Sequence, residues 1–184
     1  MISKNYTLAI GHVKRDLPIV PINSITSIAS FVLLGDAELA HEAAQQLKNR
    51  LPKDFDCIVT MESKGIPLAQ ELAVLMQQPR YVVLRKSVKS YMNSPLTTDV
   101  SAITTQAHQQ LVLDQNDADY LQNKKIILLD DVISSGGSLL AAETLLQQIN
   151  VNIVTKAAIL AEGDAAKRDD IVYLQPLPLF KPDA

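Results

Sequence analysis

The sequence predicts a doubly wound α/β domain with a parallel sheet, and three observations support this. Residues Ile126 to Leu129 form an unbroken apolar run, which is typical of a parallel strand buried on both faces. Strand-like segments of this kind alternate with segments of strong helix formers, as expected when crossover helices join the strands. The chain has 184 residues and 47% hydrophobic content, which is enough for the core of one domain over residues 1–184.

The N-terminal segment reads YTLAIGHVKRDLPIVPI and is interrupted by Pro18 and Pro21. Proline has no N–H to donate to a ladder, so we expect an edge or extended segment here and not a central strand. The following stretch, SITSIASFVLLGD, is rich in β-branched residues, and both helix and strand remain open for it. Asn23 is most simply a turn or helix cap in this setting.

The first half of the chain then alternates helix and strand. A helix is predicted for AELAHEAAQQLKNRL, which has helical apolar spacing and ends before Pro52. A buried strand is predicted for FDCIVTMES, and a helix with Pro67 in its first turn for KGIPLAQELAVLMQ. A third strand is predicted for RYVVLRK, residues 80–86. Cys57 lies in an apolar run, so we expect a buried thiol and not a nucleophile.

The second half begins with a long polar stretch, residues 87–123. Two short β-like pieces near 99–104 and 109–113 predict a hairpin within it. A long polar loop inside a compact domain is usually functional or mobile. A helix is predicted for GSLLAAETLLQQIN and a buried strand for VNIVTKAAILAEG. The chain ends in IVYLQPLPLF, which predicts an edge strand broken by Pro176 and Pro178.

Composition argues against several classes of function. The net charge is −3 and neither end carries a basic cluster, so nucleic-acid binding is not expected. No apolar run approaches the roughly 18 residues that a membrane span needs, and the N-terminus lacks a signal-peptide pattern. The single cysteine cannot form an internal disulfide, which fits the reducing cytoplasm.

The stretch around Asp130 and Asp131 has the order strand, acidic pair, small-residue loop, helix. Ligands of open α/β sheets bind outside the carboxyl ends of the strands. A loop without bulky side chains lets a phosphate approach the N–H groups at the helix start. The two carboxylates suit sugar hydroxyls or a divalent cation. We therefore predict a sugar phosphate, with its ribose on the aspartates and its phosphate on the loop. The loop residues are Ser134, Ser135, Gly136, Gly137 and Ser138.

Other phosphate motifs are absent from the sequence. The Walker A loop needs Gly-Lys-Ser/Thr and the dinucleotide fingerprint needs G-x-G-x-x-G, and neither occurs. For SSGG alone, a Gly-rich turn before a serine-capped helix would be the better interpretation. The full order of four hydrophobics, two aspartates, two hydrophobics and SSGGS favours the phosphate site.

The stretch ILLDDVISSGGS resembles the signature of the type I phosphoribosyltransferases, which bind 5-phosphoribosyl-1-pyrophosphate (PRPP). In that family the two acids contact the ribose hydroxyls and the loop wraps the 5′-phosphate. The resemblance covers roughly residues 15–180. It implies a core of about residues 36–162 and a small hood from about 1–35 and 163–184. It also implies Mg²⁺ held mainly through PRPP with no direct protein ligand, and a homodimer.

The segment MESKGIPLA is similar to the loop that contacts pyrophosphate in the adenine and xanthine enzymes. The resemblance therefore implies PRPP contacts at Ser63, Lys64 and Gly65. Taken alone, Lys64 would be an ordinary solvated loop lysine.

Arg85, Lys86 and Lys89 follow the strand at 80–86. Three cations at one strand end repel each other unless an anion sits among them, and the diphosphate of PRPP would be such an anion. The family carries Arg-Lys-x-x-Lys at this place, whereas an isolated RKSVK would be a solvated basic turn. The implied catalytic residues are Asp130, Asp131, Lys64 and Arg85.

The residues that contact the base are implied by the resemblance alone. Xanthine enzymes have an asparagine twelve residues before a Gly-Asp pair, and Asn23 has this spacing from Gly35. Asn23 and its neighbour Ile22 are therefore implied at the base, together with Glu162. Xanthine enzymes place a lysine after the corresponding glutamate, but this chain has Gly163. The difference argues against xanthine and favours adenine.

The predicted reaction joins a purine base, most simply adenine, to PRPP and gives a nucleoside 5′-monophosphate and pyrophosphate, as in purine salvage. A xanthine-type enzyme and a non-catalytic PRPP-sensing regulator are the alternatives, and an orotate or hypoxanthine enzyme fits ESKGI and RKxxK less well. Adenine enzymes carry a loop glutamate, whereas this chain has ITTQ at 103–106, which favours the alternatives. Repressor relatives carry a DNA-binding domain before the fold, and here only about 15–35 residues precede it.

Overall fold

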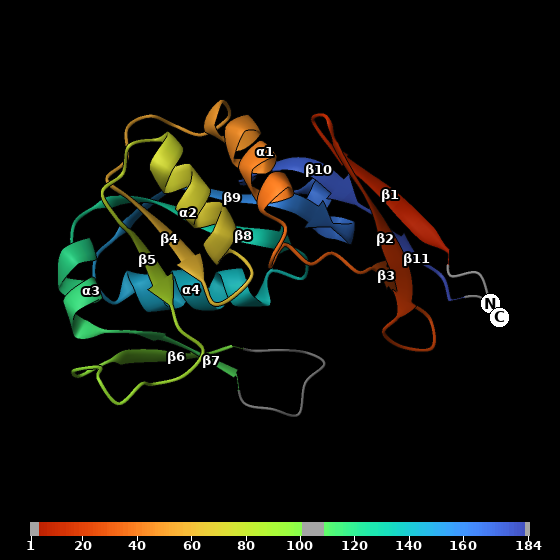
Figure 1. Cartoon of the computed structure of the whole chain (residues 1–184). Helices are drawn as coiled ribbons and strands as arrows, with labels where there is room; N and C mark the ends of the chain where they lie inside the picture. Colours follow the sequence, from red (N-terminus) through yellow and green to blue (C-terminus); the bar gives the residue numbers. More distant parts are fainter. Residues whose placement is uncertain (1–3, 101–108, 183–184) are drawn as a thin grey trace.

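The computed structural model describes residues 4–100 and 109–182 (Figure 1). Its largest sheet has five parallel strands in the order β10-β9-β8-β4-β5. The strands, in chain order, are β4 (Cys57–Met61), β5 (Tyr81–Leu84), β8 (Lys125–Ile133), β9 (Asn152–Glu162) and β10 (Ile171–Leu177). This confirms the predicted parallel sheet, including the edge position of the C-terminal strand.

Helices cover both faces of this sheet (Figure 1). One face carries α1 (Ala37–Lys48) and α2 (Ile66–Leu75). The opposite face carries α3 (Gln115–Leu121) and α4 (Gly137–Gln147). The doubly wound prediction is therefore confirmed.

The strand β8 explains why both faces are covered. Ile127 and Leu129 pack in the hydrophobic cluster of α1 and α2, whereas Ile126 and Leu128 pack in the cluster of α3 and α4. Successive side chains of a strand point to opposite faces, so an unbroken apolar run needs an apolar partner on each side.

A second sheet has four antiparallel strands in the order β1-β2-β3-β11 and forms the hood over one end of the core (Figure 1). Its strands are β1 (Asn5–Ile10), β2 (Val13–Pro21), β3 (Ser27–Ala29) and β11 (Leu179–Phe180).

The C-terminal segment, expected in the hood over about 163–184, contributes strands to both sheets within its described residues. Of the described residues 163–182, Leu179–Phe180 join the hood sheet, whereas β10 pairs with β9 in the main sheet. A short 3₁₀ helix, η1 (Gly163–Lys167), connects β9 to β10.

The expectation that prolines confine the N-terminal segment to an edge is wrong, because β2 lies between β1 and β3. Pro18 pairs with Asn5 at the last position of the β1–β2 ladder, and Pro21 pairs with Ser27 at the last position of the β2–β3 ladder. Each missing N–H therefore falls at the end of a ladder, where it interrupts no interior hydrogen bond.

The predicted hairpin is present as β6 (Leu96–Val100) and β7 (Gln109–Leu113). Its first strand begins earlier than expected, and residues 101–104 of the predicted piece lie outside the described residues, as does the ITTQ stretch at 103–106. A bridge between Arg85 and Val112 fixes β7 beside the end of β5. None of the helices within residues 4–100 and 109–182 is long and apolar enough to cross a membrane.

Candidate active site

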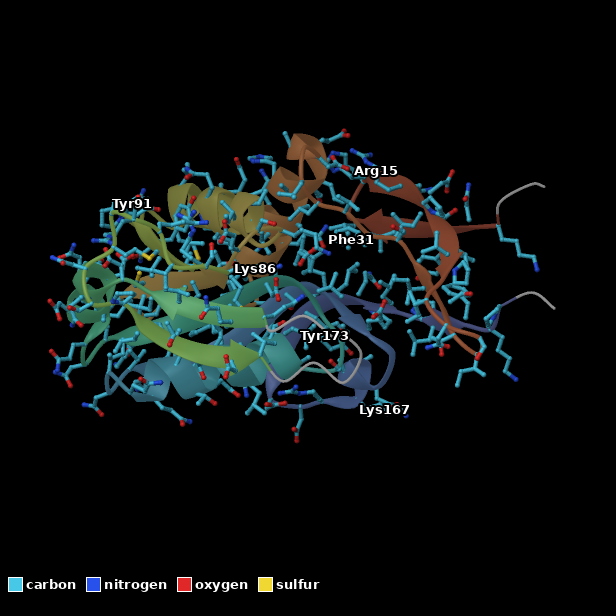
Figure 2. All side chains as sticks on the ribbon, turned by 90° about the horizontal axis from the view of Figure 1, so that it is seen from below. Arg15, Phe31, Lys86, Tyr91, Lys167 and Tyr173 are labelled. Atoms are coloured by element: carbon cyan, nitrogen blue, oxygen red, sulfur yellow. The ribbon has the colours of Figure 1, made fainter. Side chains whose placement is uncertain are left out.

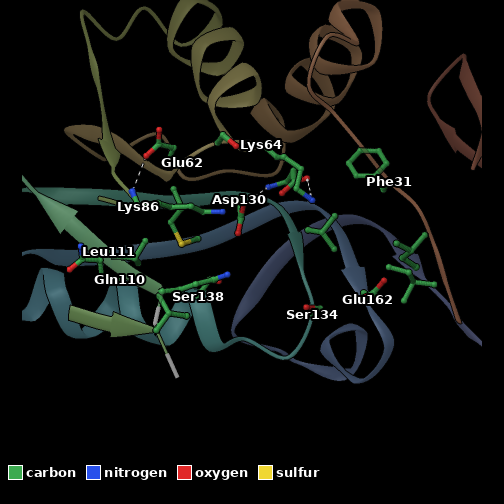
Figure 3. A pocket seen from close by; sticks show the side chains of 18 of the residues that line it. Phe31, Glu62, Lys64, Lys86, Gln110, Leu111, Asp130, Ser134, Ser138 and Glu162 are labelled. Carbon is green, nitrogen blue, oxygen red and sulfur yellow. Dashed lines mark hydrogen bonds and ion pairs between the residues drawn. The ribbon is translucent and has the colours of Figure 1, made fainter. Parts of the chain in front are cut away.

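A cavity of about 270 Å³ opens at the carboxyl ends of β4, β8 and β9 (Figure 3). The chain runs outward from β4 to β5 on one side and from β8 through β9 to β10 on the other. The strand order therefore reverses between β4 and β8, and ligands of open α/β sheets bind at such a switch point. The cavity lies where the fold class predicts a binding site.

The acidic pair lies on the wall of this cavity, at the end of β8. Asp131 is 4% exposed, and its Oδ2 accepts no hydrogen bond from any described residue. Its nearest cation is the Nζ of Lys64, at 3.6 Å. An unsatisfied buried carboxylate oxygen is costly, so a ligand that donates hydrogen bonds would relieve it.

Burial also disfavours charge on Asp130. Desolvation, followed by the neighbouring Asp131 carboxylate, raises the pKa of Asp130 to about 8. The Oδ1 of Asp130 accepts one hydrogen bond, from the N–H of Asp131 at 2.8 Å. Two adjacent carboxyl groups here would be stabilised by a ligand that donates hydrogen bonds or by a cation.

The small-residue loop connects β8 to α4 and has its own hollow of about 50 Å³, lined by residues 132–139 and Asp130. Gly136 is the N-cap of α4 and has a left-handed backbone with φ of 81°. Within the described residues, no side chain caps this helix start, which contradicts the alternative of a serine cap. The N–H groups at the start of α4 are therefore available to an anion. Ser134 and Ser138 also line the main cavity.

The loop after β4 brings Ser63 and Lys64 to the cavity wall. Gly65 lies directly against β8, because a Cβ at this position would come within 2.3 Å of the Oγ1 of Thr60 and 3.5 Å of the Cα of Asp130. The hydroxyl of Thr60 in turn donates to the carbonyl of Leu129 at 2.9 Å. A glycine at 65 thus lets the two loops meet closely.

Of the three predicted cations after β5, Lys86 lines the cavity, whereas Arg85 and Lys89 are not among the described lining residues. The Nε–H of Arg85 donates to Glu62 at 3.2 Å, and its Nη1 donates to the Tyr91 hydroxyl at 3.1 Å. The Nζ of Lys89 donates to a serine hydroxyl at 2.6 Å.

Glu62 binds both Arg85 and Lys86 at the end of the cavity that follows β5. It accepts the backbone N–H of Lys86 at 2.8 Å, and this bond, together with Arg85, lowers the pKa of its carboxyl. Glu62 itself lines the cavity and pairs with the Arg85 guanidinium, and among the described cations Lys64 and Lys86 line the wall (Figure 3).

The opposite end of the cavity is apolar and is closed by the hood. Ile28, Ala29 and Phe31 reach it from β3 and the segment that follows, and Glu162 reaches it from the end of β9. Figure 2 shows Phe31 in the region where the hood strands meet the core. Burial raises the pKa of Glu162.

Ile22 and Asn23 are not brought to the described part of the cavity wall. Ile22 is 57% exposed, and the Oδ1 of Asn23 accepts the N–H groups of Ile25 and Thr26 at 2.9 and 2.8 Å. Asn23 thus stabilises the turn between β2 and β3, as its simplest interpretation predicts.

Sequence reasoning missed the aromatic and apolar residues of the hood, above all Phe31. The apolar stretch FVLL after β3 was the available signal. It also missed Gln110 and Leu111 of β7, which line the other end of the cavity. Within the described residues, no group of three or more His, Cys, Asp or Glu side chains could hold a metal ion.

Curated relatives with detectable sequence similarity include hypoxanthine/guanine phosphoribosyltransferases of archaea. The protein of Methanobacterium lacus is 31% identical over 137 residues, which cover 74% of this chain and 68% of the relative. The protein of Methanococcus maripaludis is 31% identical over 144 residues, which cover 76% and 71%.

Similar solved structures include adenine phosphoribosyltransferases. The enzyme of Thermoanaerobacter pseudethanolicus matches with a TM-score of 0.65 and 19% identity over 78% of this chain and 84% of that chain. The enzyme of Giardia lamblia matches with a TM-score of 0.66 and 18% identity over 94% and 93%. At these identities the likeness shows the fold.

The model of the phosphoribosyl transferase domain family matches residues 35–176, which include the acidic pair, the small-residue loop and the loop after β4. The sequence, the switch-point cavity and these comparisons agree, and the chain belongs to the type I phosphoribosyltransferases, in their purine branch.

Proposed function

We propose that this purine phosphoribosyltransferase joins adenine to PRPP and releases adenosine 5′-monophosphate and pyrophosphate. The observation that carries the proposal is the buried acidic pair beside an uncapped helix start. The unpartnered Oδ2 of Asp131 would accept a ribose hydroxyl, with Asp130 beside it. The N–H groups and hydroxyls of residues 134–138 would hold the 5′-phosphate.

The diphosphate would lie toward the end of the cavity where Lys64 and Lys86 line the wall. As the diphosphate leaves, negative charge develops on it, and fixed cations stabilise that charge. Arg85 would contact the diphosphate if its guanidinium left Glu62. Lys89 would likewise have to leave its serine partner to reach the diphosphate. The roles of Ser63 and Gly65 would be to place the loop at the diphosphate.

The residues present fit a Mg²⁺ ion that arrives with PRPP. Carboxylate oxygens are the ligands Mg²⁺ prefers, and the buried oxygen of Asp131 lacks a hydrogen-bond partner among the described residues. The diphosphate itself would supply most of the ligands, with Asp130 and Asp131 reaching the ion through the ribose hydroxyls. When bound, Mg²⁺ neutralises charge on the diphosphate.

The proposal of adenine rests on the apolar end of the cavity. Phe31 offers a flat apolar surface for a base, and the carboxyl of Glu162 accepts hydrogen bonds, as an amino group would require. Gly163 has a φ of 60°, and a Cβ there would lie 2.9 Å from the Cδ1 of Leu179. Residue 163 therefore offers no side chain that could meet the second oxo group of xanthine.

Hypoxanthine or guanine is the second candidate. The curated relatives named above are called hypoxanthine/guanine enzymes, and the N1–H and 2-amino groups of guanine would also donate to a carboxylate. The apolar walls and the Glu162 carboxyl would accept either kind of base, so turnover decides between them.

The test is pyrophosphate release from PRPP and Mg²⁺ with adenine, guanine, hypoxanthine, xanthine and orotate in separate reactions. We expect turnover with adenine. Turnover with guanine or hypoxanthine alone would reassign the base but keep the reaction. Tight PRPP binding without turnover on any base would contradict the enzyme and favour a PRPP-sensing regulator. The homodimer that the resemblance implies stays a prediction, which light scattering would check.

A further inference from the structure

Four charged side chains form a connected network next to the small-residue loop, and none of them lines the cavity within the described residues. The guanidinium of Arg168 donates two hydrogen bonds to the carboxylate of Asp170, from Nε at 2.8 Å and from Nη2 at 2.7 Å. Asp170 also accepts the Nζ of Lys156 at 2.6 Å, and Lys156 reaches Glu143 of α4 at 2.8 Å. The network thus joins α4, β9 and the segment before β10.

The third nitrogen of this guanidinium faces the loop. The Nη1 of Arg168 lies 3.0 Å from the position that a Cβ on Gly136 would occupy. Gly136 is the left-handed N-cap of α4, at the centre of the loop. The guanidinium therefore lies directly against the position that the Cβ of a side chain at residue 136 would take.

The two hydrogen bonds to Asp170 fix the position of the Arg168 guanidinium. A bidentate Arg–carboxylate pair holds the planar guanidinium in one orientation, which a single hydrogen bond would not do. Because Lys156 also holds Asp170, the carboxylate has two cationic partners, and its pKa lies well below the usual range, with Arg168 as the larger cause. Nε and Nη2 are used for Asp170, which leaves Nη1 directed at Gly136.

We propose that Arg168 is a positioning residue for the 5′-phosphate: its guanidinium, held by Asp170, lies against the loop at Gly136 and directs Nη1 toward it. The inference rests on the proposed function, because it takes residues 134–138 as the phosphate site. Arg168 acts through its contact with the loop and through its electrostatic field. It therefore strengthens binding of the 5′-phosphate and not of the base or the diphosphate. It adds a cation to a loop that carries none of its own.

The chain offers a matched control one residue away. Lys167 also lies at the end of η1 and carries a positive charge, but its side chain is 79% exposed and pairs with Asp164 on the surface. Arg168→Met and Lys167→Met thus remove the same formal charge from neighbouring positions. Arg168→Lys keeps the charge and loses the two-bonded fork.

The experiment is calorimetric titration of the full chain with two ligands, ribose 5-phosphate and magnesium pyrophosphate. For Arg168→Met we expect ribose 5-phosphate affinity to fall about three- to tenfold, the size of a partly screened charge interaction, while pyrophosphate affinity stays within about twofold. The loss should shrink at high salt. Arg168→Lys should recover part of the affinity, and Lys167→Met should leave both ligands unchanged.

Four results would overturn the inference. Unchanged ribose 5-phosphate affinity in Arg168→Met would show that the charge does not act on the phosphate. An equal loss for both ligands, or a loss that salt does not change, would show that Arg168 serves only the folded structure. Failure of the unmodified chain to bind ribose 5-phosphate would remove the phosphate site itself, which distinguishes a wrong function from a wrong role for Arg168.

Discussion

The carboxyl of Asp130 has an environment that favours its protonated form, and this links stability to pH. Its pKa is raised from 3.8 to about 8 by burial and by Asp131. A group whose pKa is raised on folding stabilises the folded state fully below its unfolded pKa and loses that contribution as pH rises through the folded pKa. The window for Asp130 therefore runs from about pH 4 to about pH 8.

We expect the free energy of unfolding of the ligand-free protein to fall by up to about 1.4 kcal/mol per pH unit between pH 5 and pH 8.5. The melting temperature should fall with it. Asp130→Asn removes the titrating group, so its melting temperature should fall less over the same range. Thermal scans of both proteins at closely spaced pH values provide the measurement. Parallel curves would show that Asp130 does not titrate in this window.

Asp131 carries a different prediction, because its Oδ2 has no hydrogen-bond partner among the described residues. Asp131→Asn keeps the shape and removes the charge, so we expect kcat/KM for PRPP to fall about a hundredfold or more, with little change in melting temperature. Asp164→Asn, at a side chain that is 92% exposed, is the control. The prediction fails if activity survives and PRPP affinity is unchanged.

At the scale of single residues, the sequence predicted the location of those residues that are placed by the course of the backbone alone. Asp130 and Asp131 follow a buried strand, so their position at the carboxyl end of the sheet was predictable. The destination of the Arg85 side chain was not, because its partner Glu62 comes from another strand-end loop. Phe31 was missed for a similar reason, since only the folded hood turns it toward the cavity.

The loop between β8 and α4 depends on glycine at residue 136. A non-glycine residue at its φ of 81° costs roughly 1–2 kcal/mol, and a methyl group there would also meet Arg168. Gly35 provides a matched comparison, with a φ of 85° and nothing within 4 Å of its Cβ position.

We therefore expect Gly35→Ala to lower the stability by about 1–2 kcal/mol, and Gly136→Ala by at least as much, because its Cβ also meets Arg168. Only Gly136→Ala should also weaken ribose 5-phosphate binding. Urea unfolding and calorimetry together separate the two effects. Equal affinities for the two variants would mean that the loop does not hold the phosphate.

Elements with strong local patterns were predicted well, as was the β6–β7 hairpin, but the inner position of β2 in its sheet was not. The helices α1, α2 and α4 follow helix-forming stretches with clear limits, such as Pro67 at the start of α2. The prolines of β2 suggested an edge, but they fall at the ends of two ladders on opposite sides of an inner strand. Local preference specifies a segment, whereas its neighbours decide which groups remain unpaired.

At the scale of the molecule, hood and core share one hydrophobic cluster. Leu8 and Ile10 of β1 belong to the same cluster as Leu39 and Leu47 of α1 and the inner side chains of the main sheet. This contact could not be predicted from sequence patterns, because the segments are far apart along the chain. The shared cluster means that the hood packs against the core and does not merely cover one end of it.

We therefore expect a single cooperative unfolding transition. Leu39→Ala, at a fully buried position of α1, should lower the stability by about 2–5 kcal/mol and shift the transition as a whole. Urea unfolding followed by tyrosine fluorescence and far-ultraviolet circular dichroism would check this. Two separate transitions would show that hood and core unfold independently.

The most direct test of the central claim is release of pyrophosphate from PRPP with and without a purine base, in the unmodified protein and in Asp131→Asn. We predict release that depends on one purine base and on Mg²⁺, and that the substitution nearly abolishes. Base-independent release, or full release by Asp131→Asn, would contradict the assignment of the buried acidic pair to the ribose of PRPP.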